Sequence, residues 1–162
     1  MSDILRLFFI IVLLTIGLAA YFLVVGVLFA NRVTKTQRVI NQIPGRSFLV
    51  GLVNFLFFGV IALILFSVAD GAGGVLKGIL MIPALLITVM LAVILSFGLA
   101  GMVDILGERV FPEHSAWKKT LWGTVILTFA CALPFVGWFL LLPYAALLGF
   151  GAVILGFFQR EP

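Results

Sequence analysis

The sequence predicts an all-α integral membrane protein, folded as a single helical bundle of about five transmembrane helices over residues 1–162. Three observations lead to this fold class. Hydrophobic residues make up 64% of the 162 residues and charged residues only 10%, and the mean hydropathy is +1.36. The apolar runs are each long enough to cross a bilayer as a helix. A soluble domain of this size could not bury so much apolar surface.

The first expected span covers about residues 4–30, a length that allows the helix to tilt. It exceeds the apolar region of a signal peptide, so we expect it to be retained as an anchor. The polar stretch 31–46 follows. Val33, Ile40 and Ile43 fall near one helical face of it, which is typical of a helix lying along the membrane surface.

The second and third spans are expected at about 48–69 and 78–106, joined by a short glycine-rich turn. Pro44 and Gly45 are expected to turn the chain before the second span, and Ser47 to cap its helix.

The last apolar region, residues 120–158, contains no charged side chain. One straight helix of that length would be nearly twice as long as the roughly 30 Å hydrocarbon core is thick. Residues 134–138 combine a proline, a glycine and a tryptophan, which is typical of a turn at the membrane interface. We therefore expect two helices, about 116–133 and 139–158, that cross as a hairpin. A re-entrant hairpin and one long bent helix are the alternatives.

The distribution of Lys and Arg predicts the orientation. With five spans, two basic residues fall on one side, Arg6 and Lys77, and eight on the other: Arg32, Lys35, Arg38, Arg46, Arg109, Lys118, Lys119 and Arg160. The side with the larger number is expected to be cytoplasmic. The N-terminus is therefore expected outside and the C-terminus in the cytoplasm.

Asp104 and Glu108 lie four residues apart, so on a helix they share a face that Ala92, Ser96 and Ala100 continue. Small residues at this spacing let another helix approach closely. The leading interpretation is that the two acids form ion pairs with bases on the same side, which are Arg38, Arg46 and Arg109. The alternative is an entry site for protons or cations that includes His114.

Asn54 is the main polar residue within the second span, and an amide in lipid needs a partner. We expect an interhelical hydrogen bond there, with a place on a substrate path as the alternative. Gly149, Gly151 and Gly156 are expected to allow close helix packing in the last span, because no strand precedes them as a dinucleotide site would require.

Several functional classes lack their signatures. Cys131 is the only cysteine and His114 the only histidine, so we expect no metal site, no cofactor and no catalytic residues. No acid or base lies deep in a span, which argues against a coupled pump or voltage sensor. The net charge of +4 is explained by membrane orientation, so no nucleic-acid partner is expected.

Four segments carry a resemblance: Pro44 to Asn54, Gly107 to Arg109, Leu133 to Trp138 and Gly149 to Ala152. Together they resemble an uncharacterised group of bacterial polytopic membrane domains, some of which look like the membrane portion of bactofilin-type polymer-forming proteins. The resemblance covers most of the chain from Pro44 onward. It implies a location in the bacterial cytoplasmic membrane and supplies no catalytic residues.

Together these features favour a non-enzymatic membrane protein that serves as an accessory or scaffold subunit of a larger bacterial membrane complex. Short loops leave little soluble surface for other work. Its expected partners are the lipid bilayer and other membrane subunits, or further copies of the chain. The alternative is a small oligomeric channel or carrier for an ion or small solute, with the pore between protomers.

Overall fold

The computed structural model describes residues 2–133 and 135–158, and in this part of the chain every regular element is a helix. In chain order they are α1 (Ser2–Leu28), α2 (Ala30–Gln42), α3 (Pro44–Gly71), α4 (Gly74–Val110), α5 (Ala116–Ala132), the π-helical turn η1 (Gly137–Leu141) and α6 (Leu142–Phe158). The expected all-α fold is confirmed.

Four helical segments in the described residues are long and apolar enough to cross a membrane: Leu5–Leu28, Pro44–Gly71, Gly74–Val110 and Gly137–Phe158. They correspond to the first, second, third and last expected spans. The fourth expected span, over 116–133, is represented by α5, which has 17 residues. At 1.5 Å per residue α5 is about 26 Å long, slightly less than a typical hydrocarbon core.

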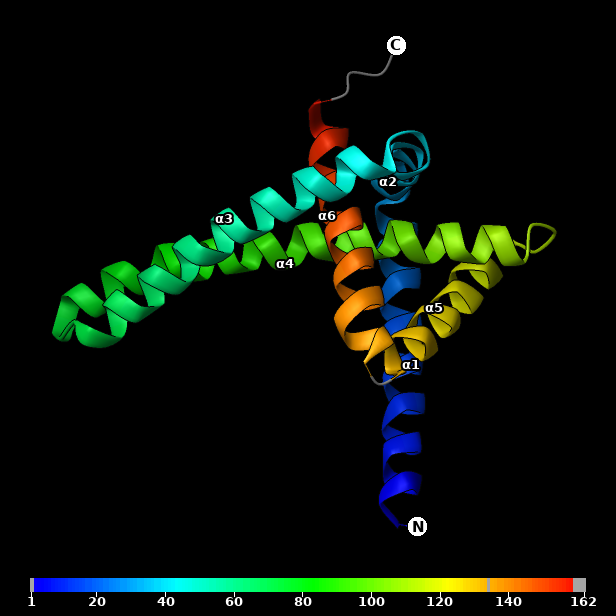
Figure 1. Ribbon diagram of the computed structural model, residues 1–162, viewed down its shortest axis with the longest axis horizontal. Coiled ribbons are helices and arrows are strands. Elements are labelled where there is room, and N and C mark those ends of the chain that lie inside the picture. The colour runs from blue at the N-terminus through cyan, green and yellow to red at the C-terminus, as the bar shows by residue number, and fades with distance from the viewer. Residues whose placement is uncertain (1, 134, 159–162) are drawn as a thin grey trace.

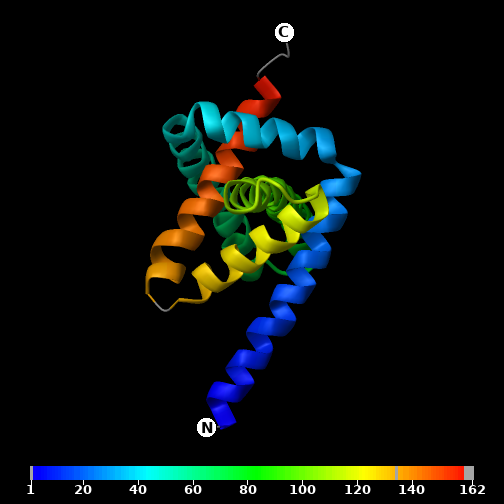
Figure 2. The ribbon, with the colours of Figure 1, turned by 90° about the vertical axis from the view of Figure 1, so that its right-hand side faces the viewer.

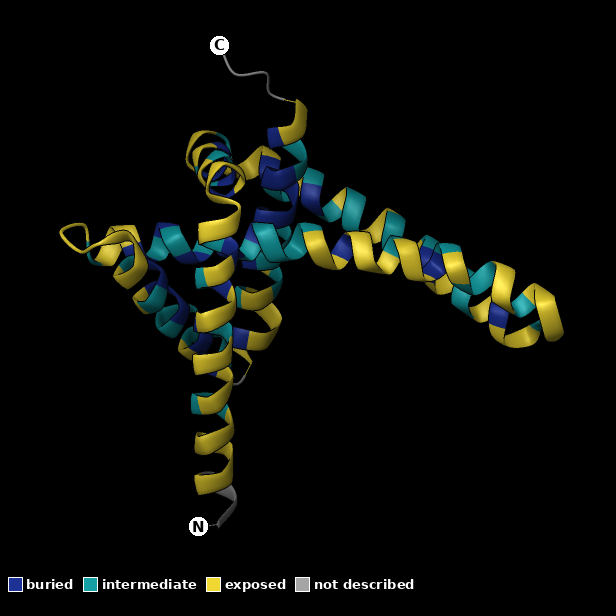
Figure 3. Cartoon of the chain, turned by 180° about the vertical axis from the view of Figure 1, so that it is seen from behind, coloured by how far each residue is buried: buried dark blue, intermediate teal, exposed yellow. Residues whose placement is uncertain are grey.

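Three groups of helices diverge from a common junction (Figure 1). α1 runs from the junction down to the N-terminus, the α3–α4 hairpin extends to the left, and α5 and α6 form a shorter hairpin whose tip points toward the same end as the N-terminus. α2 crosses α4 and α6 on the opposite side (Figure 2). Buried residues concentrate at the junction, whereas the first half of α1 and much of the α3–α4 hairpin are exposed (Figure 3).

Glycines bring the backbone of α6 against two other helices at this junction. A methyl group on Gly151 would overlap the carbonyl of Ser47 in α3, and one on Gly149 would overlap the backbone of Gly98 in α4. The close packing expected for Gly149 and Gly151 is therefore found. Gly156 lies in looser surroundings, because the nearest atom to a methyl group there would be the Lys35 Cγ at 3.7 Å.

The polar segment after α1 is helical, as expected. Val33 and Ile40 of α2 are buried, and Ile43 is partly buried against the hydrophobic cluster that contains Ile40. The expected capping role of Ser47 is wrong. α3 begins at Pro44, and Ser47 lies inside the helix, where its hydroxyl donates to the Ile43 carbonyl at 3.0 Å. Proline suits the first turn because its missing N–H would have had no partner there.

The α3–α4 hairpin is longer than the two expected spans, with 28 and 37 residues in its helices. Both helices continue past the ends of their apolar runs, because polar residues can also be helical at the ends of a helix. Gly74 starts α4 with a positive φ of 59°. An ion pair between Lys77 and Asp70, with Nζ and Oδ1 3.2 Å apart, joins the two helices beside this turn.

α5 and α6 form a hairpin, and not the single long bent helix that was one of the alternatives. α5 ends at Ala132 and η1 begins at Gly137, while Phe135 in the turn has a φ of 65°. A methyl group on Gly137 would overlap the carbonyls at the end of α5, so glycine is required for this tight reversal. Pro134, expected in the turn, and Arg160, used for the orientation, lie outside the described residues.

Candidate functional site

The predicted acid pair lies where α5 packs against the end of α4. Two glycines allow this close approach. A methyl group on Gly107 would overlap the carbonyl of Lys119, and one on Gly123 would overlap the carbonyl of Val103. The short connection after Val110 returns the chain beside α4, so the start of α5 lies next to the two acids.

Asp104 and Glu108 each have a partner on α5. The Thr120 hydroxyl donates to Oδ1 of Asp104 at 2.6 Å, a short distance typical of a hydrogen bond to a carboxylate. Lys119 Nζ lies 4.0 Å from Oε1 of Glu108, with the Glu108 side chain largely exposed. Asp104 is thus held at the helix contact, and Glu108 lies at its rim.

These partners differ from the expected ones. Within the described residues, none of Arg38, Arg46 and Arg109 comes within 4.0 Å of either acid. All three arginines are exposed, and the positions next to the acids are taken by α5. The signal that could have revealed this is the spacing of Thr120 and Thr124 on one face of an otherwise apolar segment.

Three threonines at four-residue spacing form the buried face of α5: Thr120, Thr124 and Thr128. The Thr124 hydroxyl donates to the Thr120 carbonyl at 2.8 Å, within the same helix. Every buried side-chain nitrogen or oxygen in the described part of the chain has a hydrogen-bond partner. The cluster therefore resembles an interhelical clasp, with no orphaned polar group aimed at a ligand.

The other predicted polar residues lie apart from this cluster. Asn54 Nδ2 donates to the Val50 carbonyl at 2.9 Å, so its amide is engaged by its own helix rather than by a neighbouring one. His114 is exposed and packs against the Phe111 ring, with centroids 5.2 Å apart. The structure therefore does not bring Asn54 or His114 to the acids as parts of one site.

The face of small residues beside the acids, formed by Ala92, Ser96 and Ala100, is only partly used for helix packing. Ala100 is buried, but Ala92 is exposed, and the tight contacts of α4 are made by its glycines. Across residues 5–133 and 135–158, no three His, Cys, Asp or Glu side chains lie close enough together to hold a metal ion.

Replacing Thr120 by valine is expected to lower the free energy of unfolding in detergent by about 1–3 kcal/mol, since it leaves the Asp104 carboxylate half-buried without its donor. Valine keeps the volume of threonine. Thr88→Val is the matched control, because Thr88 is exposed and bonds only its own helix. Thermal unfolding of both variants tests the clasp. Equal melting temperatures for the two would show that the Asp104 contact contributes nothing.

No protein family, curated protein or solved structure matches this chain.

Proposed function

We propose that this chain is an accessory or scaffold subunit of a larger bacterial membrane complex and that it binds a partner subunit through its α3–α4 hairpin. The main observation behind this proposal is the open shape of the folded chain. The chain has 10459 Å² of accessible surface, whereas a compact protein of 17.6 kDa would have about 7,900 Å². The excess of about 2,500 Å² is comparable to the area that a stable subunit interface buries.

One long exposed part of the chain is the arm, defined as residues 56–96 of the α3–α4 hairpin (Figure 3). Inside the arm the two helices meet through a few buried residues, which are Ala62, Ala69, Ala84 and Leu91. Their outer faces carry large exposed apolar side chains, including Leu63, Ile64, Ile82, Leu85 and Leu86. Helices in a bilayer associate by close packing, since lipid is as apolar as their side chains. The arm offers long faces for such packing.

Location and orientation form part of the proposal. The basic residues of α2 and of the helix ends that flank the α4–α5 connection lie on elements away from the N-terminus, the tip of the arm and the tip of the α5–α6 hairpin (Figure 1). This separation supports the orientation with the N-terminus outside and the basic side in the cytoplasm.

Photo-crosslinking in living cells tests the interface. A photoreactive amino acid at Leu63 or Leu86 of the arm, which are 69% and 65% exposed, is expected to give one discrete adduct with a second membrane protein. Leu140 of η1 is the matched control at 65% exposure and is expected to give no such band. The adduct is identified by mass spectrometry after purification.

Two other outcomes contradict the proposal. Adducts between two copies of this chain at Leu63 and Leu86 would favour the alternative function, an oligomer that forms a channel or carrier. Identical patterns at Leu63, Leu86 and Leu140, with lipid as the only adduct, would show that lipid alone covers the arm.

A further inference from the structure

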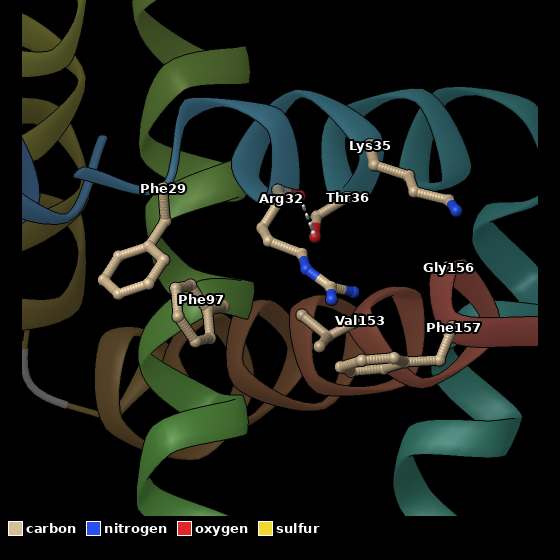
Figure 4. A pocket seen from close by; sticks show the side chains of 8 residues that line it. All are labelled: Phe29, Arg32, Lys35, Thr36, Phe97, Val153, Gly156 and Phe157. Carbon is tan, nitrogen blue, oxygen red and sulfur yellow. Dashed lines mark hydrogen bonds between the residues drawn. The ribbon is translucent and has the colours of Figure 1, made fainter. Parts of the chain in front are cut away.

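A cleft of about 220 Å³ lies beside the first turns of α2, between that helix, α4 and the end of α6. Figure 4 shows its composition. Phe29, Phe97 and Phe157 provide apolar walls, while Arg32 and Lys35 extend from α2 over the cleft. Apolar walls and a basic rim are therefore combined in one concavity, away from the Asp104 cluster.

Specific contacts hold these walls in place. The Phe29 and Phe97 rings pack edge to face, with centroids 5.0 Å apart. The guanidinium carbon of Arg32 lies 4.6 Å from the centroid of the Phe157 ring, a cation–π distance that fixes the charge at the rim. Gly156 adds no side chain beneath Lys35. The cleft thus exists because contacts hold the side chains around it in place and because Gly156 has no side chain to fill it.

The surrounding charge is strongly positive. Residues 4–69 contain no Asp or Glu, yet Arg32, Lys35, Arg38 and Arg46 lie within this stretch. Among the described residues no carboxylate comes within 4.0 Å of Arg32 or Lys35. Two cationic side chains with several N–H donors at one concavity favour an anionic ligand, and a phosphate group matches the guanidinium donors well.

The position of the cleft along the apolar helices indicates where such a ligand comes from. α2 buries one face against the junction and carries polar side chains on the other, and it connects the ends of the apolar helices α1 and α3. A helix of this kind lies at the level of lipid head groups. The volume is below the roughly 300–1,000 Å³ of pockets that enclose a whole drug-sized ligand. It suits a head group whose acyl chains lie outside.

We propose that this cleft binds the phosphate-bearing head group of an anionic phospholipid, with Arg32 and Lys35 contacting the phosphate and Phe29 and Phe97 contacting the start of an acyl chain. Anionic lipids are concentrated in the cytoplasmic leaflet and attract basic segments next to the membrane. This inference does not depend on the partner proposed for the arm.

The test is titration of the full chain in a neutral detergent with phosphatidylglycerol, with native mass spectrometry as the measurement of bound lipid. The double variant Arg32→Gln, Lys35→Gln is expected to bind the lipid at least about tenfold more weakly, the effect of losing charge-assisted hydrogen bonds. The matched control Arg38→Gln, Arg46→Gln removes the same charge outside the cleft and is expected to change the affinity by less than about threefold.

A second variant tests the cavity without altering charge. Gly156→Leu adds bulk beneath Lys35 and is expected to weaken phosphatidylglycerol binding as well, in a chain whose melting temperature shows that it is folded. Equal losses of phosphatidylglycerol affinity in the cleft variant and the control variant would overturn the proposal, because they would indicate diffuse electrostatic attraction in place of a specific site. Equal binding of phosphatidylcholine, or displacement of the lipid by millimolar inorganic phosphate, would also overturn it, the latter by identifying free phosphate as the ligand.

Discussion

Replacing Gly149 by alanine is expected to destabilise the folded chain by about 1–3 kcal/mol, the usual cost of inserting a methylene-sized group into a tightly packed contact. The added methyl group would overlap the backbone of Gly98, which no change of side-chain rotamer relieves. α4 and α6 would have to separate. The measurement is thermal unfolding of the purified protein in detergent, followed by tryptophan fluorescence.

Gly59→Ala is the matched control. Gly59 lies inside α3 with no atom near the position that a methyl group would take. Alanine is a better helix former than glycine, so this variant is expected to be unchanged or more stable by up to about 0.5–1 kcal/mol. A Gly149→Ala variant that melts together with Gly59→Ala would contradict the assigned contact between α4 and α6.

The same junction predicts how two substitutions combine. Gly98 and Gly149 face each other across one contact, so once α4 and α6 have separated for one methyl group, the second meets less resistance. The cost of Gly98→Ala together with Gly149→Ala should therefore be smaller than the sum of the single costs, as is usual for residues in direct contact.

The helical elements were predictable from sequence because they depend on local features. Apolar runs located the spans, and the helix after α1 followed from the spacing of Val33 and Ile40. The turn between α5 and α6 followed from the proline, glycine and tryptophan at 134–138. Helix ends were predicted less well, because hydropathy marks where apolar residues stop, whereas α3 and α4 continue into polar residues.

The arrangement of these helices was not predictable in the same way. Which glycines meet depends on crossing positions that no periodicity specifies, so the pairing of Gly98 with Gly149 and the outward direction of the arm required three-dimensional information. The partner of Asp104 was missed for a related reason. Sequence reasoning favoured an arginine because of its charge, but the glycine contacts between α4 and α5 place the Thr120 hydroxyl there instead.

Whether the tip of the α5–α6 hairpin reaches the outer surface of the membrane depends on the length of α5 and on the residues at the tip. α5 is about 26 Å long, slightly short of a roughly 30 Å core. The tip, however, exposes Phe135, Trp138 and Phe139, and aromatic side chains, tryptophan in particular, favour the membrane interface. A small thinning of the bilayer or the few residues of the turn can make up the difference. We therefore expect the tip to face the exterior.

Cysteine labelling tests this expectation. In a Cys131→Ser background, Val136→Cys is expected to react in intact cells with a membrane-impermeant thiol reagent, because thiolates form in water and hardly at all in hydrocarbon. Val136 is 55% exposed. Gly73→Cys at the tip of the arm serves as the external reference, and Asn41→Cys at an exposed position of α2 serves as the internal one. Labelling of Val136→Cys only after permeabilisation, as expected for Asn41→Cys, would show that α5 does not cross. Protection under both conditions would show that the hairpin is re-entrant, with its tip buried within the membrane.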